Sequence, residues 1–236
     1  MRLSLVIPCF NEAANLPQLA GRCERVLASD RVEEVILIDN GSIDDSPIIL
    51  ERLVAANSRL RSIRVAINQG YGHGVLQGLA AARGDILGWT HADMQTDPVD
   101  ALAGLELFAT DPAPERLYVK GRRRGRPCSD RAFTLAMSAF ETLLLGRVLT
   151  DINAQPNMFH RSFFETWVDP PKDFSLDLYA YHAAKQAGLR VRRFPVTFGE
   201  RAFGVSHWNV DWRGKAKFIR RTLDFSFRLR RGRNCP

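Results

Sequence analysis

This 236-residue sequence lacks the features that define several common classes of protein. It has no apolar run approaching the ~20 residues that a helix needs to span a bilayer. Its N-terminus enters a strand-like segment without the small-residue cleavage site of a secretory signal. Its four cysteines are scattered, without the paired spacing of zinc or redox sites. These absences predict reduced thiols in a cytoplasmic protein, and they leave open peripheral contact with the inner face of a membrane.

Positive charge is concentrated in two places rather than spread along the chain. The formal net charge is +7, and residues 213–236 carry nine basic side chains against one acid, Asp224. A second cluster, Arg-Arg-Arg-Gly-Arg, occupies residues 122–126. Clustered basic charge suits phosphates, anionic lipid surfaces or nucleic acid. Because no aromatic side chain stands within the cluster to stack on bases, we do not expect nucleic acid as a partner.

Strand and helix patterns alternate through the first half of the chain. Strands are expected at residues 3–8, 34–39, 62–67 and 85–89, with helices at 15–28, from 45 and at 70–82. This alternation predicts an α/β fold with a mostly parallel sheet. The second half is less regular, with expected strands at 117–120, 157–159 and 190–196 and helices at 131–149 and 173–187.

The last segment has the pattern of a basic amphipathic helix. Ile219, Leu223 and Phe227 recur at i, i+4 and i+8, and Phe218 and Phe225 widen this stripe. The stripe could dock on the rest of the domain, which is the interpretation that we favour. It could also lie on a membrane surface.

The segment His91-Ala92-Asp93-Met94-Gln95 follows the fourth predicted strand directly. On an extended segment, side chains at i and i+2 point to the same side, so Asp93 and Gln95 are expected to place their oxygens together. Open α/β sheets bind ligands beyond such strand ends. Oxygen ligands with open positions suit Mg²⁺ or Mn²⁺ bridging to substrate phosphates. The structural alternative is a polar loop in which Asp97 caps the next helix.

Other loops at strand ends carry weaker signals. Asp39 could accept hydrogen bonds from a base edge or a ribose, or its turn could bond only its own backbone. Glu12 is a second carboxylate in such a loop. The glycine-rich segment 70–74 looks like a dinucleotide fingerprint, but it follows the third strand, and Gln77 stands where the last glycine would be. Close packing explains these glycines at least as well.

Six motifs follow one another between Val6 and Ser206. They are Val6-Ile7-Pro8-Cys9-Phe10-Asn11-Glu12, residues 38–46, residues 68–72, residues 91–98, Asp151-Ile152-Asn153 and residues 201–206. In this order they resemble the motifs of the family 2 glycosyltransferases, and most closely those of the dolichol-phosphate mannosyltransferase-like branch. Six ordered motifs are far more specific than any one of them.

The resemblance implies a fold of the GT-A type, which is Rossmann-like and has helices flanking its sheet. Residues 1–210 would form this domain, with a nucleotide-sugar-binding half at 1–98 and an acceptor half at 99–210. The basic segment 211–236 would follow. The residues around the nucleotide would be Pro8, Asn11, Glu12, Asp39, Asn40, Gly41, Asn68 and Gly72.

The resemblance also implies a divalent metal, Mn²⁺ or Mg²⁺, that holds the diphosphate of a nucleotide-sugar donor. The candidate metal ligands are His91, Asp93 and Gln95. The candidate catalytic residues are Asp93, Arg201 and Asp151, and the candidates for binding the acceptor or its phosphate are Arg123, Arg131, Ser206 and Asp177.

Two residues depart from the family pattern. Asn40 replaces the second aspartate of the nucleotide motif, which is expected to remove one carboxylate contact with the base or ribose. His91 replaces the first aspartate of the metal motif. A neutral imidazole keeps a ligand but removes a negative charge, and it favours softer ions than Mg²⁺. Whether His91 binds the metal at all stays open.

The leading interpretation is an inverting transferase that moves a sugar to a polyprenyl phosphate at a membrane surface. A phosphate acceptor is already ionised near neutral pH, with a second pKa of about 6. The alternative acceptor is a hydroxyl group, in glycan or natural-product assembly, and it would need a general base. Asp151 and Asp177 are the candidates for this base, and both could equally be structural. A non-catalytic scaffold or an anionic-surface binding protein is a further alternative.

Overall fold

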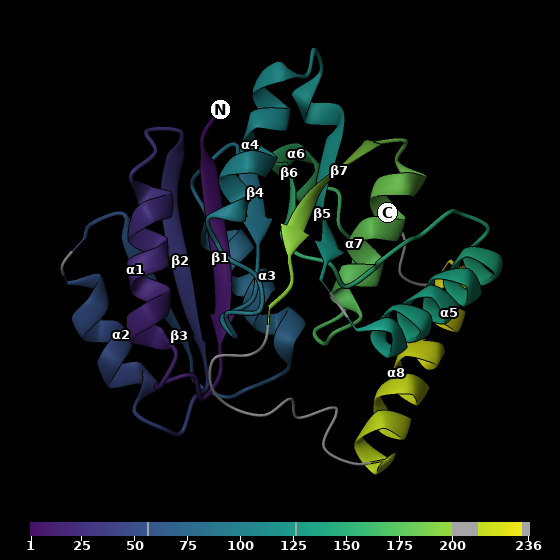
Figure 1. Ribbon diagram of the computed structural model, residues 1–236, viewed down its shortest axis with the longest axis horizontal. Coiled ribbons are helices and arrows are strands. Elements are labelled where there is room, and N and C mark those ends of the chain that lie inside the picture. The colour runs from purple at the N-terminus through teal and green to yellow at the C-terminus, as the bar shows by residue number, and fades with distance from the viewer. Residues whose placement is uncertain (56, 126, 200–211, 233–236) are drawn as a thin grey trace.

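The computed structural model describes residues 1–55, 57–125, 127–199 and 212–232 (Figure 1). Strands and helices alternate through the first half, as predicted. The elements are β1 (Leu3–Cys9), α1 (Leu16–Leu27), β2 (Val32–Asn40), α2 (Ser46–Val54), β3 (Leu60–Val65), α3 (Tyr71–Ala81), β4 (Ile86–Trp89) and α4 (Asp100–Thr110). The second half contains η1 (Pro114–Arg116), β5 (Leu117–Arg124), α5 (Cys128–Leu145), β6 (Asn157–His160), α6 (Arg161–Phe164), α7 (Leu176–Gln186), β7 (Arg190–Thr197) and α8 (Trp212–Arg230).

The seven strands form one sheet in the order β3-β2-β1-β4-β6-β5-β7. β1 lies between β2 and β4 and is parallel to both, and β2 pairs in parallel with β3. β6 is antiparallel to β4 on one side and to β5 on the other. The predicted mostly parallel sheet is confirmed. The strand order reverses at β1, because β2 and β3 extend the sheet to one side of it and β4 lies on the other. In open α/β sheets, ligands bind beyond the carboxyl ends of the strands at such a point.

Helices cover both faces of the sheet, because the central strands are buried on both sides and bear apolar residues almost throughout. One core joins the sheet to α1, α2 and α4 through side chains such as Leu19, Leu50 and Leu105. The other joins it to α3, α6, α7 and α8. The Trp89 side chain, at the end of β4, is fully buried in this second core.

The C-terminal helix α8 is confirmed as a helix, and Phe225 of the predicted stripe docks in the core, but the rest of the predicted docking face is only partly right. Between residues 219 and 230, where its side chains are described, the buried ones are Thr222, Phe225, Ser226 and Leu229. Ile219 and Phe227, from the predicted stripe, are 40% and 45% exposed. Two hydroxyl residues, Thr222 and Ser226, form part of the buried face. The Ser226 hydroxyl donates to the Glu141 carboxylate of α5 at 2.7 Å, so the buried face is partly polar and a search for apolar periodicity misses it.

α5 and α8 lie side by side at the end of the molecule opposite α1 and α2 (Figure 1). Along α5 from residue 132 to 143, every exposed side chain is apolar: Ala132, Phe133, Leu135, Ala136, Ala139, Phe140 and Leu143. On α8, the exposed side chains include Arg220, Arg228 and Arg230. We call these exposed residues of the two helices the α5–α8 surface. Within the ranges described above, no helix is long and apolar enough to cross a membrane.

Candidate functional site

Asn11, in the loop after β1, joins that loop to the loop after β2. Its backbone N–H donates to Ser42 Oγ at 3.0 Å, and its Oδ1 accepts from the Ile43 N–H at 3.0 Å. Asn11 adopts a left-handed φ of 55°, which a non-glycine residue holds only where its surroundings fix it. One residue on, the Glu12 N–H donates to Ser46 Oγ at 3.0 Å. The predicted nucleotide residues at the end of β1, which include Pro8, and in the loop after it therefore lie beside those at the end of β2.

Asp39 stands at the end of β2 with its carboxylate buried. Oδ1 accepts from the Ser42 N–H at 2.9 Å, which confirms the predicted turn contact. Among the described residues, Oδ2 has no hydrogen-bond donor, although Arg64 Nε of β3 lies 3.4 Å from it as an ion pair. Sequence reasoning missed Arg64, because only the strand register places it opposite Asp39. The nucleotide role of Asp39 stays a prediction.

The glycines after β3 are required by close packing. A Cβ on Gly70, whose φ is +118°, would lie 2.4 Å from the carbonyl oxygen of Lys172, and one on Gly72 would lie 2.6 Å from that of Pro171. These distances confirm the packing interpretation. At the same loop the Asn40 amide donates to the Gly70 carbonyl at 2.9 Å. A carboxylate could not donate there, which gives Asn40 a structural reason for replacing aspartate.

The other glycine of the predicted nucleotide set, Gly41, has a φ of +77°, and a Cβ there would lie 2.6 Å from the Asn68 nitrogen. Asn68 is exposed and accepts from the Gly70 N–H through its Oδ1 at 2.8 Å. Both residues therefore shape the loops that border the edge of the sheet. Contacts of Gly41, Asn68 and Gly72 with a nucleotide stay predictions.

The segment after β4 is a bend, so the prediction of an extended segment is wrong. Met94 has a left-handed φ of 63°, which turns the chain between Asp93 and Gln95. Asp93 Oδ1 accepts from the Gln95 N–H at 3.2 Å, and the Gln95 side-chain amide lies 3.4 Å from the Gly199 carbonyl. The i and i+2 argument for placing the two side-chain oxygens together therefore fails here, because it requires extended backbone.

The donor set suits a metal that is held jointly with a phosphate ligand. Among the residues that the structure describes, no three His, Cys, Asp or Glu side chains converge on one point. Mg²⁺ and related ions are commonly held by one or two carboxylates together with substrate phosphates, rather than by a cage of protein ligands. Asp93, half-buried beyond β4, fits that arrangement. The assignments of Asp93, Gln95 and His91 as ligands stay predictions.

If His91 is a metal ligand, Mn²⁺ should support sugar transfer better than Mg²⁺, because imidazole suits softer ions. His91→Asp should then shift the preference back towards Mg²⁺ by restoring a carboxylate. The measurement is the ratio of initial rates with the two ions, in the natural protein and the variant. An identical ratio in both proteins would show that His91 is not a metal ligand and has another role.

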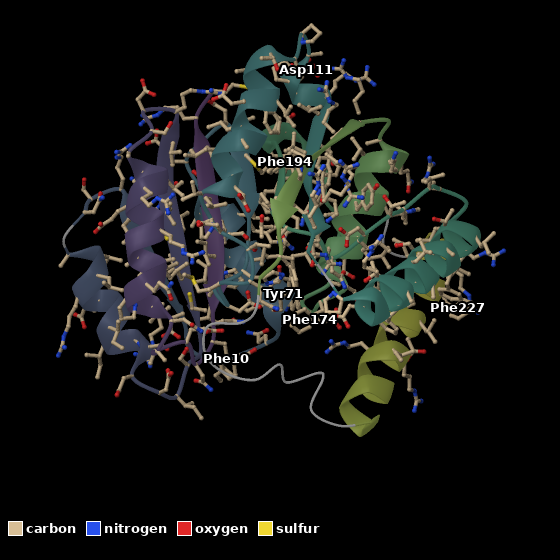
Figure 2. The ribbon with its side chains drawn as sticks, viewed as in Figure 1. Phe10, Tyr71, Asp111, Phe174, Phe194 and Phe227 are labelled. Atoms are coloured by element: carbon tan, nitrogen blue, oxygen red, sulfur yellow. The ribbon has the colours of Figure 1, made fainter. Side chains whose placement is uncertain are left out.

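An aromatic row that the sequence analysis missed runs from His91 to α8. The Tyr71 ring lies 5.3 Å from His91 and stacks on Phe174 at 4.8 Å, with 7° between the planes. The Arg221 guanidinium of α8 lies over the Phe174 ring at 5.8 Å. Figure 2 labels Tyr71 and Phe174 next to each other, from α3 and the segment before α7. Residues 103 positions apart give no periodic signal, so no sequence pattern could have paired these two rings.

Asp151 is held between two arginines. Arg123 of β5 donates to both of its oxygens, and Arg193 Nη2 of β7 lies 3.7 Å from it. Burial by itself would raise the pKa of Asp151, but the hydrogen bonds and charge of Arg123 outweigh burial and hold this pKa below its ordinary value. A carboxylate of low pKa is a weak general base. This geometry favours the structural interpretation of Asp151.

Asp177 is buried at the start of α7, and its Oδ1 accepts from Trp89 Nε1, Gln155 Nε2 and Asn157 Nδ2 at 2.8–3.1 Å. Lys120 Nζ donates to Asn157 Oδ1 at 2.7 Å. Burial raises the pKa of Asp177 and lowers that of Lys120 to about 7. Such a satisfied buried network fixes the end of β4 against α7, and it favours the structural interpretation of Asp177.

Of the four residues predicted to handle phosphate or the acceptor through arginine or serine side chains, only Arg123 and Arg131 lie in the described part of the chain. Arg131 is exposed near the start of α5. Arg201 and Ser206 lie outside the described residues. Arg123 would have to share its guanidinium between Asp151 and any phosphate. Their roles, and that of Arg201 in catalysis, stay predictions.

This is an open α/β sheet with carboxylates at the strand ends beside its switch point, which is where proteins of this class bind their ligands. Comparison with protein-family models narrows this class. Residues 4–169 match the model of glycosyl transferase family 2, and the chain belongs to that family.

Two curated relatives illustrate its relationships. Glycosyltransferase AglD of Haloferax volcanii is 29% identical over 83% of this chain. Undecaprenyl-phosphate 4-deoxy-4-formamido-L-arabinose transferase of Sodalis glossinidius is 32% identical over 47% of it. The chain spans about a third of the length of each of these relatives, 33% and 34%.

Solved structures confirm the GT-A type of fold. Glucosyl-3-phosphoglycerate synthase from Mycobacterium tuberculosis, in complex with Mn²⁺, UDP and glucosyl-3-phosphoglycerate, aligns with a TM-score of 0.75. The alignment covers 98% of this chain and 80% of the synthase, at 18% identity. At this identity the likeness concerns the fold alone.

Proposed function

We propose that this protein is an inverting glycosyltransferase that moves a sugar from a nucleotide-sugar donor to a polyprenyl phosphate. One observation carries the proposal. Glu12 and Asp93 follow β1 and β4, and Asp39 lies at the end of β2, so all three carboxylates are at the ends of neighbouring strands around the point where the strand order reverses. Open α/β sheets bind nucleotides at such a point. Membership of glycosyl transferase family 2 supports sugar transfer as the reaction at this site.

The reaction is a single displacement at the anomeric carbon of the sugar. An acceptor oxygen forms a bond to that carbon as the bond to the donor diphosphate breaks, and the bonding electron pair leaves with the diphosphate. A divalent metal held with Asp93 would neutralise the charge that develops on this leaving group. Arg201 is proposed to stabilise the same charge. Groups placed in advance around developing charge are worth far more than the same groups in water.

The state of the two candidate bases supports a phosphate acceptor. Arg123 lowers the pKa of Asp151, which makes it a weak base. The pKa of Asp177 is raised, but this carboxylate is buried and its Oδ1 already accepts three hydrogen bonds, so neither of the two is well placed to take a proton from a hydroxyl group. An ionised phosphate needs no such base. The relative from Sodalis glossinidius is named as an undecaprenyl-phosphate transferase, which agrees with this acceptor class. The alternative remains a soluble transferase acting on a hydroxyl acceptor in glycan or natural-product assembly.

The α5–α8 surface supports a location at a membrane. It combines an uncharged apolar face on α5 with exposed arginines on α8. Apolar side chains can enter the boundary between headgroups and acyl chains, while basic side chains attract anionic lipids. We propose that the protein binds peripherally through this surface, which would bring it to the lipid that carries the acceptor phosphate.

The direct test is a thermal-shift screen of nucleoside diphosphates and nucleotide sugars, with and without Mn²⁺. A matching nucleotide with Mn²⁺ at a hundred times its Kd should raise the melting temperature by roughly 5–10 °C. Chelating the metal should remove most of this shift. If no nucleotide shifts the melting temperature in the presence of Mn²⁺, the proposed function is wrong.

A further inference from the structure

The aromatic row described above joins the metal motif to the C-terminal helix. We propose that Phe174 and Arg221 are positioning residues for His91, acting through Tyr71, so that the placement of α8 affects ligand binding beyond β4. The inference rests on the proposed function in one respect: it takes the segment after β4 to be the place where the metal and diphosphate bind.

The inner part of the row is fixed by two contacts of Tyr71. Its ring stacks on Phe174 with nearly parallel planes, at 4.8 Å and 7°. Its hydroxyl lies 3.4 Å from Gln155 Nε2, which in turn donates to the buried Asp177. The ring is therefore held by the stack on Phe174 and by the contact of its hydroxyl, and its centre lies 5.3 Å from that of the His91 ring. Aromatic pairs in this distance range attract each other beyond simple burial.

The backbone supports the same row. The segment 171–173 packs directly on the glycine loop, where a Cβ on Gly72 would lie 2.6 Å from the Pro171 carbonyl oxygen. The His73 N–H donates to the Lys172 carbonyl at 2.8 Å. Phe174 follows this segment immediately. A shift of Phe174 must therefore be accompanied by a shift at the start of α3, where Tyr71 lies.

The outer part of the row belongs to α8. Arg221 Nε lies 3.1 Å from Asp173 Oδ2, and its guanidinium covers the partly exposed Phe174 ring. One arginine thus contacts two successive residues of the segment before α7. Cation–π attraction and the ion pair act in the same direction, and both hold α8 against this segment. Five residues further along α8, Ser226 donates to Glu141 of α5, which is part of the proposed membrane surface.

The physical consequence is reciprocal. If α8 holds Phe174 and Tyr71 against His91, loosening α8 must weaken binding of a metal–diphosphate ligand there. Binding of that ligand must in turn tighten the contact of α8, because a coupling free energy between two sites acts equally in both directions. The protein would then bind its donor best when α8 is in place.

Arg221→Gln tests this coupling against a matched control, Arg220→Gln. Both variants lose one charge from neighbouring positions of α8, but Arg220 is exposed and lies outside the row. We expect Arg221→Gln to weaken the binding of UDP with Mn²⁺, measured by calorimetry, about two- to fivefold. Arg220→Gln should bind as the natural protein does. If UDP is not the nucleotide, the one identified by the thermal screen takes its place.

Phe174 provides a second pair of variants. Phe174→Leu removes the stack and keeps an apolar side chain, and it should weaken the same binding by up to about two- to tenfold. Phe174→Tyr keeps the ring, and this variant should bind the nucleotide with Mn²⁺ as the natural protein does. Amide hydrogen exchange of residues 70–74 and 90–96, measured without any ligand, should be faster in Arg221→Gln and Phe174→Leu than in their controls.

These measurements separate the coupling from the proposed function. If Arg221→Gln and Phe174→Leu match their controls in both nucleotide binding and hydrogen exchange, the coupling is overturned. If the natural protein binds no nucleotide with Mn²⁺, the proposed function fails. In that case the hydrogen-exchange comparison still decides whether α8 holds the segment after β4.

Discussion

Replacing Asp93 with asparagine is expected to lower the rate of sugar transfer by about 10²–10³-fold while leaving the fold intact. The amide keeps the size of the side chain and an oxygen that can accept from the Gln95 N–H. It removes the negative charge that a divalent ion requires. The measurement is kcat with Mn²⁺ at saturating donor, together with the circular dichroism spectrum and the melting temperature of the variant.

Asp97→Asn is the matched control for this experiment. Asp97 lies four residues further along the same segment, where its carboxylate pairs with Arg22 at 3.3 Å and Arg25 at 3.9 Å on α1. These half-exposed pairs are worth little, about 0–1 kcal/mol, so this variant should fold and keep most of its activity. Natural activity in Asp93→Asn, or equal losses in the two variants, would remove Asp93 from the metal site.

The second large effect is expected at the α5–α8 surface. Binding to vesicles that contain anionic lipid should be strong at low salt and fall steeply as salt is added, because screening shortens the reach of surface charge to about 10 Å at 0.1 M. Leu143→Ser should weaken the vesicle binding that remains at high salt about tenfold or more. Leu143 is 84% exposed, and the burial of its side chain in lipid would be lost. Vesicle co-sedimentation over a salt series measures both effects.

Ile48→Ser is the control for that loss of apolar surface. Ile48 is 52% exposed on α2, at the opposite end of the molecule, so its replacement should leave vesicle binding unchanged. Deleting α8 would be a poorer test, because Phe225 and Leu229 are buried in the core and their loss would unsettle the whole domain. A protein that ignores anionic vesicles and transfers sugar only to a soluble hydroxyl compound would contradict the lipid-phosphate interpretation.

Much of the fold was predictable because its signals are local. Apolar runs such as 34–39 and 85–89 end in polar turns, and the helices between them start with Asn, Ser or Pro signals. The docking face of α8 was predictable only in part, through Phe225. Ser226 is buried because Glu141, 85 residues earlier, supplies its hydrogen bond, and hydrophobic periodicity contains no such information.

The candidate site was predictable to a similar extent: its local motifs could be read from the sequence, and its long-range contacts could not. Ordered motifs identified the family and located Asp39 and Asp93 at strand ends, because each motif is a short contiguous stretch. What these residues contact depends on the assembled fold. The ion pair of Arg123 with Asp151 and the stack of Tyr71 on Phe174 each arise from packing between distant segments. Arg201 and Ser206 keep only the support that their motif gives them.

The position of β6 has a consequence for building chimaeras from members of this family. β6 comes from the second half of the chain, yet it pairs with β4 of the first half on one edge and with β5 on the other. A cut near residue 98 would leave the backbone of β4 without its antiparallel partner, and an exposed strand edge promotes aggregation. Hybrids that exchange acceptor specificity should therefore carry β4 and β6 from the same parent and exchange only the segments that project from the sheet.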